Sequence, residues 1–477
     1  MPDTSDATEA DASTLRPGIE DRLSRLLQLD TVSSTVAAES TTAFEQLLEE
    51  LYPLVHRHLT KERIGERGFL FSWTPLVEEH AETAALRDAA LRGAPQNPRA
   101  SRNADPVVLM AHFDTVPAVA AEWSFDPFSG HISDGAVHGR GAVDDKGALV
   151  TMLDAVENLL AAGETPARPV LISLGGDEET TGPSAQAISE ELHARGIRPW
   201  IVIDEGGAVI DAPLPTLNHQ SAMVGVAEKG AVTVRLTATA PPSHAATPSR
   251  ARTAPERLAR AITRLRRNPF PKRLNRTART MFQSFEGVAT GAGKTLVTVA
   301  PKLGPVTARL LAAMGGEPAA LVQTTIAFTL LDAGTAHNVI PNTASATLNL
   351  RLAVGDSVDQ VVAILKRAIR DDSITIELLE GYPASPESRT DNAQWQAITR
   401  AVAESYPEAV VAPYVMLQAS DARHFHRFTP DATYRFAPLA MSAAERAAIH
   451  GIDERVTIDA LVRGERFYRQ LLLHLPT

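Results

Sequence analysis

The sequence predicts an α/β protein in two parts: a larger domain with a mostly parallel sheet covered on both faces, and a smaller α+β domain inserted into it. Strand-like apolar runs alternate with helical patterns between Val107 and Ile203, which is typical of parallel sheets. From about Ala227 the runs instead alternate apolar and polar residues, as half-exposed antiparallel strands do. The chain has 477 residues, of which 44% are hydrophobic, and can bury the cores of two or three domains.

The larger domain begins after the first 15 or so residues, which we expect to form a flexible tail. Helical patterns cover Ile19–Leu29 and Thr42–Leu59, and Glu78–Asp105, rich in Ala, Arg, Asn and Pro, is predicted to end in a surface loop. Short apolar runs then indicate buried strands, with helices between the later ones. The strands are Val107–Ala111, Val137–Gly139, Pro169–Leu174 and Trp200–Ile203, and the helices are Gly147–Ala162 and Ser184–Arg195.

The inserted domain is predicted to follow the order strand, helix, strand, strand, helix, strand. Its first strand is Gly230–Ala240, followed by a helix at Ala254–Arg267 and a long irregular stretch. The later elements are the strands Gln323–Leu331, Ala344–Leu352 and Ser373–Leu379, with the helix Val358–Ile369 between the last two. Around Gly381–Pro386 the chain is expected to return, so residues 1–226 and 382–477 would form the larger domain and 227–381 the insert.

Composition and charge exclude several classes of protein. The net charge of −11 argues against nucleic-acid binding, which usually needs a basic face. No apolar run reaches the ~18 residues of a membrane span, and the acidic, polar N-terminus does not resemble a signal peptide. We therefore expect a cytoplasmic protein without nucleic-acid or membrane partners. Because the chain has no cysteine, a metal site in it must use His, Asp and Glu.

Carboxylate and imidazole side chains follow the ends of predicted strands in the larger domain, where sites of open α/β sheets lie. They are His112 and Asp114, Asp144 and Asp145 in a glycine-rich segment before a helix, Glu178 and Glu179, and Asp204 and Glu205. Taken singly, His112 is more often a packed or surface histidine, and paired acids are usually solvated residues at helix starts. Together, so many acids would repel one another unless a cation neutralised them. This predicts a divalent metal site, for zinc first and manganese or cobalt as alternatives.

The segments HFDTVP, GRGAVDDKG, DEE and DEGG, in this order, resemble those of the M20 family of metallopeptidases. The family includes aminoacylases, carboxypeptidase S and dipeptidases. The resemblance extends to Ser243-His244, to Asn338–Asn342 and to Ile449–Gly451, and covers the chain beyond its N-terminal tail. It implies a zinc-peptidase-like α/β/α catalytic domain with an inserted ferredoxin-like lid, which in many members is also the dimerisation domain. A homodimer through the lid is expected, with a monomer as the alternative.

The resemblance also implies two zinc ions per subunit. His112 would bind one ion, Asp144 would bridge both, and Glu179 with His450 would bind the second. The remaining ligand of the first ion would be Glu205 or Asp204, of which Glu205 is favoured because it precedes a glycine. In this family the peptide bond between Asp144 and Asp145 is typically cis.

Roles in catalysis follow from the same resemblance. Glu178 would be the general base, and Asp114 would hydrogen-bond His112 and fix its tautomer. His244 matches the histidine that stabilises the tetrahedral oxyanion, although Pro-Ser precedes it and Ala follows it here, in place of the commoner Gly-Gly-His-Ser. Three further residues would bind substrate. Asn338 would contact it directly, Arg423 could clamp an α-carboxylate, and Arg351 could bind a carboxylate or simply end a strand.

Two functions of different classes remain. The first is a di-metal amidohydrolase that cleaves an N-acyl amino acid or short peptide with a free carboxylate, and the second is a catalytically silent relative acting as a binding or scaffold protein. Retention of Glu178 and of every expected ligand favours the enzyme. An extra apolar and basic segment, Leu265–Leu311, resembles the carboxypeptidase S and N-fatty-acyl amino acid hydrolase branch, which favours an uncharged or hydrophobic substrate. Within it, Val297–Met314 could line a pocket or pack inside the lid.

Overall fold

The computed structural model describes residues 16–34, 38–74, 105–211, 219–247 and 250–476. The expected N-terminal tail and nearly all of the expected loop Glu78–Asp105 lie outside these residues. The chain divides into two compact units. Unit 1 contains the chain up to Gly225, Ser388–Ala412 and the segment from Ser420, and unit 2 contains Val226–Glu387 and Pro413–Ala419.

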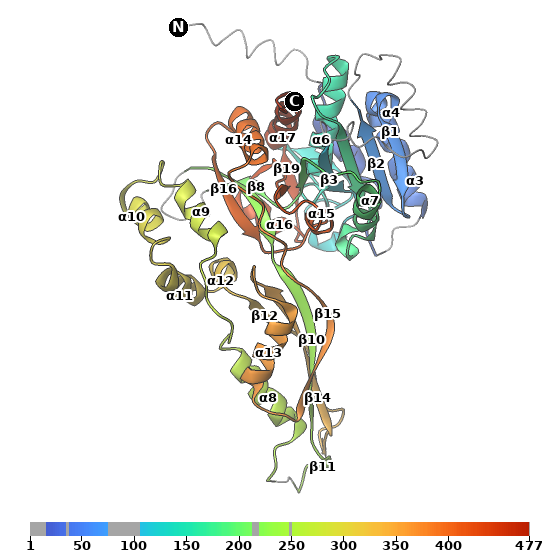
Figure 1. Cartoon of the computed structure of the whole chain (residues 1–477). Helices are drawn as coiled ribbons and strands as arrows, with labels where there is room; N and C mark the ends of the chain where they lie inside the picture. The colour runs from blue at the N-terminus through green and yellow to red at the C-terminus, as the bar shows by residue number, and fades with distance from the viewer. Residues whose placement is uncertain (1–15, 35–37, 75–104, 212–218, 248–249, 477) are drawn as a thin grey trace. The chain divides into compact units, whose positions relative to one another are not determined.

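Unit 1 is built on a ten-stranded sheet (Figure 1). Its central strands are parallel, and a hairpin and further antiparallel strands flank them. The α/β prediction is confirmed, but the sheet is mixed rather than mostly parallel, because the unpredicted hairpin turns within a few residues and can only pair antiparallel. The order is β1 (Thr60–Ile64), β2 (Gly68–Trp73), β6 (Val170–Gly175), β3 (Val107–His112), β7 (Ile201–Asp204), β17 (Thr433–Arg435), β9 (Ser221–Glu228), β8 (Ala208–Ile210) and β18 (Ala440–Met441), with β16 (Val410–Met416) paired to β9.

Helices cover both faces of this sheet. On one face, Val108 and Met110 of β3 pack with Ile188 of α7 (Pro183–Ala194). Alternate strand residues point to the other face, where β3 contacts α6 (Lys146–Ala161). The other α-helices of this unit lie around α6 or are the short α15 and α16. They are α2 (Ile19–Leu27), α3 (Ala38–Leu51), α4 (Pro53–His58), α14 (Ala393–Ser405), α15 (Ala422–His426), α16 (Ala443–Ala448) and α17 (Ile458–Leu473).

The sequence predicts one helix over Thr42–Leu59, but the structure has two, α3 and α4. Pro53 is the reason, because it has no N–H to donate inside a helix and is favoured in a first turn. A small sheet of β4 (His131–Ser133), β5 (Ala136–His138) and β19 (Arg455–Thr457) and two short 3₁₀ helices, η1 (Ala120–Glu122) and η2 (Glu178–Thr180), complete the unit.

Unit 2 contains an antiparallel sheet in the order β12 (Thr325–Asp332), β14 (Thr343–Leu352), β10 (Gly230–Thr239), β15 (Ile374–Tyr382). The predicted order of strands and helices is confirmed, and the first and third strands lie at the centre, as in a ferredoxin-like fold. Side chains of β10 and β14 form a core with α8 (Ala254–Leu265) and α13 (Val358–Ile369), which lie beside the sheet in Figure 1. A small ladder, β11 (Ser243–His244) with β13 (Val339–Ile340), is separate from this sheet.

Between α8 and β12 the sequence predicts an irregular stretch, but the structure has four short helices. Glycines and prolines interrupt them every ten residues or so, which hides their periodicity. No single helix in the described ranges is long and apolar enough to span a membrane. The helices Gly291–Val299 and Gly304–Met314 together reach that length and composition, but they are bent by 117° at their junction. The helices are α9 (Arg276–Ser284), α10 (Gly291–Val299), α11 (Gly304–Met314) and α12 (Gly316–Val322).

Unit 2 buries the side chain of Lys229 at the start of β10. Its Nζ donates hydrogen bonds to the carbonyl oxygens of Ala320, at 2.9 Å, and Gln323, at 2.8 Å, at the end of α12. Burial lowers the pKa of Lys229 to about 8, although the carboxylate of Asp356 opposes this and Arg351 reinforces it. The charged form of Lys229 therefore costs stability in the folded state.

We expect Lys229→Met to change how the free energy of unfolding depends on pH. Between the folded pKa of about 8 and the unfolded value near 10.4, the unfolded chain binds more protons at this site, so wild-type stability gains up to ~1.4 kcal/mol per pH unit from it. Urea denaturation from pH 7 to pH 10.5 should show this gain in the wild type and in Lys366→Met, which alters an exposed lysine of α13, but not in Lys229→Met. Identical slopes for all three proteins would contradict the shift.

Candidate metal centre

Five segments of unit 1 bring the predicted acids and histidines together. His112 is the last residue of β3, Asp144 lies in the segment before α6, and Glu179 lies in η2 after β6. Glu205 follows β7, and His450 lies between α16 and β19. Three of these positions are at or just beyond the carboxyl ends of neighbouring strands, as expected for a site of an open α/β sheet.

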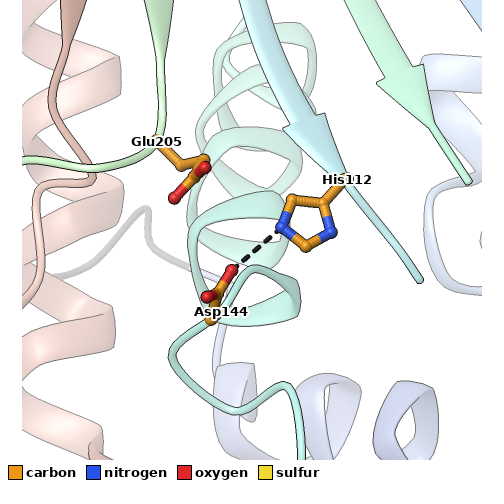
Figure 2. A group of neighbouring side chains, drawn as sticks. All are labelled: His112, Asp144 and Glu205. Carbon is orange, nitrogen blue, oxygen red and sulfur yellow. Dashed lines mark hydrogen bonds and ion pairs between the residues drawn. The ribbon is translucent and has the colours of Figure 1, made fainter. Parts of the chain in front are cut away.

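The first group is His112, Asp144 and Glu205, whose side chains point toward one another in Figure 2. One potential ligand atom from each residue lies within 4.8 Å of the others. The Nε2 of His112 is 2.9 Å from Oδ1 of Asp144. All three donors are of the kinds that zinc accepts.

The second group is Asp144, Glu179 and His450, which meets the same 4.8 Å limit. The Nε2 of His450 lies 3.1 Å from Oδ2 of Asp144 and 3.0 Å from Oε1 of Glu179. Asp144 thus belongs to both groups, with one carboxylate oxygen facing each histidine. A carboxylate in this position can bridge two cations.

Asp204 and Glu205, which the sequence leaves as alternatives, lie differently. The buried Asp204 accepts a hydrogen bond at 2.6 Å from the backbone N–H of Ala422, at the start of α15. Glu205 is the acid that joins His112 and Asp144. The geometry favours Glu205 as the ligand.

Asp114 joins the first group to the segment of η2. Its Oδ1 lies 3.3 Å from Nδ1 of His112 and also accepts the N–H of Glu178, while Oδ2 accepts the N–H of Glu179, both at 3.2 Å. The hydroxyl of Ser33 donates to the same Oδ2 at 2.7 Å. One buried carboxylate therefore contacts a histidine and the backbone N–H groups of both acids of η2.

The cis peptide bond that the resemblance implies is present between Asp144 and Asp145. Asp145 belongs to neither group among the described residues, and its Oδ2 accepts the backbone N–H of His112 at 3.2 Å.

The buried carboxylates of the site shift the pKa values of one another and of the histidines beside them. Burial raises the pKa of Glu178 well above its usual value; His112 opposes this shift, and the nearby carboxylates of Asp421 and Asp144 add to it. Burial raises the pKa of Glu205 in the same way, with Asp144 and Glu178 adding to it. Hydrogen bonds to Asp144 and then Glu179 raise the pKa of His450 as well, to about 10. Carboxylates crowded at this density are the environment that a bound cation stabilises.

Arg140 and Glu454 form a support that sequence reasoning missed. The carboxylate of Glu454 accepts a hydrogen bond at 2.6 Å from the guanidinium of Arg140. Both side chains are buried. Glu454 also accepts the backbone N–H groups of Gly141, Val143 and Asp144, at 3.2, 2.8 and 3.1 Å. This acid fixes the segment that carries Asp144. A single acid that belongs to no motif cannot be recognised from the sequence as a residue with this role. The one hint is that Glu454 lies close to His450 in the sequence.

Two predicted site residues, His244 for the oxyanion and Asn338 for the substrate, come together in unit 2. His244 pairs with Val339 across the β11–β13 ladder, and the carbonyl oxygen of Asn338 accepts the N–H of Ala245 at 3.1 Å. Both side chains are exposed. Arg351 is not with them: it pairs with Ala231, near the end of β14 far from the ladder. This position suits the reading of Arg351 as a residue that ends a strand.

Arg423 lies in α15 of unit 1. Its guanidinium donates to the carbonyl oxygens of Ser420, at 2.9 Å, and Thr181, at 2.6 Å. These hydrogen bonds connect α15 to Thr181, the residue after η2. Arg423 therefore fixes the loop that follows Glu178 and Glu179.

Comparisons with known proteins agree with this geometry. Residues 108–474 match the sequence profile of peptidase family M20/M25/M40. The N-fatty-acyl-amino acid synthase/hydrolase PM20D1 of Xenopus tropicalis is 31% identical over 97% of this chain and 86% of its own length. The probable carboxypeptidase S-like 2 of Dictyostelium discoideum is 31% identical over 90% and 78%. Among solved structures, the M20 metallo-carboxypeptidase Sso-CP2 of Sulfolobus solfataricus shares the fold with a TM-score of 0.64, at 16% identity over 96% of this chain and 99% of that one.

Proposed function

The chain belongs to peptidase family M20/M25/M40, and from this premise we propose that it is a di-zinc amidohydrolase that releases an amino acid from an N-acyl amino acid or short peptide. Family membership makes it a metal-dependent hydrolase of amide bonds. The observation that carries the finer proposal is that Asp144 is shared by two groups of ligand-type side chains.

The donor set suits zinc, with manganese or cobalt as alternatives, because it combines imidazole with carboxylates and has no sulfur. His112, Asp144 and Glu205 would hold one ion, and Asp144, Glu179 and His450 the other. When bound, such ions polarise a carbonyl and lower the pKa of water.

The reaction needs a base beside the ligands, and Glu178 is placed to serve. Its backbone is fixed by Asp114, it adjoins Glu179, and it belongs to neither ligand group. Its carboxylate would take a proton from the attacking water and deliver it to the leaving nitrogen.

The substrate that we propose has an uncharged or hydrophobic acyl group and a free carboxylate. This follows the activity in the name of PM20D1 and the carboxypeptidase in the name of the Dictyostelium relative. Arg423 would contribute to binding the carboxylate, Asn338 would contact the substrate, and His244 would stabilise the oxyanion. His244 and Asn338 belong to unit 2, whereas both ligand groups belong to unit 1.

We further propose a homodimer through unit 2, in which His244 serves the partner subunit. A monomer in which His244 serves its own subunit is the alternative, and the mass from light scattering separates the two.

We expect the purified, zinc-loaded protein to release amino acids from a panel of N-acyl amino acids and dipeptides. Removal of metal with a chelator should lower turnover by at least about a hundredfold, and added zinc should restore it. The chelated protein should also melt at a lower temperature, because an ion bound only by the folded state stabilises it by ~4 kcal/mol at a thousand times its Kd. Two bound metals with no turnover on the whole panel would favour the silent relative, and full activity without metal would exclude the proposal.

A further inference from the structure

A stripe of large apolar side chains on α10, α11 and their junction faces solvent. The spacing is three or four residues throughout, so the side chains follow one face of each helix. Each is between 40% and 70% exposed. The residues of this apolar stripe are Leu296, Val299, Leu303, Val306, Leu310 and Met314.

The opposite face of the same helices packs inside unit 2. It does so with smaller side chains, among them Val297, Ala300 and Ala308, which are buried. Packing within the lid thus accounts for part of this apolar segment and leaves its larger side chains uncovered. Large apolar side chains exposed in such number on neighbouring helices indicate an interaction site.

The charge around the stripe is positive, in a protein whose net charge is −11. From Gly287 to Gly316 there is no acid at all. The basic residues of that stretch, Lys294, Lys302 and Arg309, are all exposed. A partner that covers the stripe should therefore be both apolar and anionic.

A lipid surface fits better than a protein groove. The stripe contains only aliphatic side chains and methionine, and α10 and α11 have none of the aromatic residues that dominate protein interfaces. Together the two helices have the length and apolar composition of a membrane span, but they are bent by 117° at their junction, a geometry in which each helix can lie along a surface. Attachment to a bilayer surface departs from the expectation of no membrane partner, which rested on the lack of a single apolar run of span length.

We propose that the α10–α11 pair docks the protein on an anionic lipid bilayer, with the apolar stripe in the acyl region and the three cations at the headgroups. Docking is independent of the proposed hydrolysis. If the docking and the proposed hydrolysis both hold, the enzyme works at the bilayer surface, where amphiphilic N-acyl amino acids accumulate.

The test is co-sedimentation of the full chain with vesicles of phosphatidylcholine alone and of phosphatidylcholine with about 30% phosphatidylglycerol. Leu310→Glu/Met314→Glu should weaken binding to the anionic vesicles at least about tenfold. Leu330→Glu/Leu331→Glu is the matched control, since these leucines of β12 are 65% and 67% exposed against 63% and 70% for Leu310 and Met314. It should bind as the wild type does. Replacing Lys294, Lys302 and Arg309 by Gln should weaken binding on the order of a hundredfold, at about fivefold per charge.

Circular dichroism and hydrolysis of a short-chain soluble substrate check that each variant is folded, because none of these residues belongs to the ligand groups. Wild-type binding that depends on phosphatidylglycerol and on the stripe supports the proposal. It is overturned by wild-type protein that stays in the supernatant, by equal binding of Leu310→Glu/Met314→Glu, or by equal binding to both kinds of vesicle. A fall in mass of that variant in light scattering, without vesicle binding by the wild type, would show instead that the stripe covers a second copy of the chain.

Discussion

Glu178→Gln should lower kcat by about 10²–10⁴-fold while both metals remain bound. The substitution removes the group that would move the proton, but it keeps the size of the side chain and the backbone N–H that donates to Asp114. Because Glu178 belongs to neither ligand group, the first effect should be on turnover. Steady-state kinetics on the best substrate of the panel, with metal content measured on the same preparation, tests this expectation.

The neighbouring Glu179→Gln is the matched control. Its carboxylate is 3.0 Å from His450 in the second group, so its replacement should reduce bound metal as well as activity. Activity of Glu178→Gln within tenfold of the wild type would refute the role of Glu178 as base. Loss of metal in both variants would show that Glu178 acts as a ligand.

Arg140→Met should destabilise the protein by about 3–5 kcal/mol and weaken metal binding by about 10–100-fold. The substitution leaves the carboxylate of Glu454 buried without its cation, and that carboxylate holds the N–H of Asp144. Arg140 also donates at 2.6 Å to the carbonyl oxygen of Gly451, next to His450, and that bond would be lost as well. Urea denaturation and zinc titration measure the two effects.

A second pair of the same chemistry provides the control. Arg195 and Glu62 form an ion pair at 2.7 Å with side chains about two-fifths exposed, and Arg195→Met should cost about 0–1 kcal/mol. In the double variant Arg140→Met/Glu454→Gln no charge is left buried alone, so it should be more stable than Arg140→Met. Equal losses for Arg140→Met and Arg195→Met would contradict the importance of the buried pair.

The sequence predicts best the parts of the site that depend on local order. His112 and Glu205 stand at strand ends that an apolar run marks plainly, so their convergence follows from the rule that sites lie beyond the carboxyl ends of strands. His450 lies outside any such pattern, and only the resemblance to a known family indicates it. Neither the strand-end rule nor the family resemblance indicates Glu454. Its partners are backbone N–H groups, which every residue type except proline presents, so no residue pattern marks this role.

The fold shows the same division. Elements with regular periodicity, such as β10 and α13, are predicted to within a residue or so of their observed ends. The strands β17 and β18 have only three and two residues, too few for any period to show, and they pair with β7 and β8 across long stretches of chain. Pairing at that range is decided by the packing of the whole sheet and not by local sequence.

The position of His450 has a consequence for synthesis of the chain on the ribosome. Asp144 and Glu179 emerge before unit 2 is made, whereas the histidine that meets both is added after it. At about 5–20 residues per second, the nascent chain carries two of the three residues of the second group for on the order of tens of seconds before the third exists. During elongation the second group of ligand-type side chains is therefore incomplete. A chain released early, even with all of unit 2 translated, would be unable to assemble it.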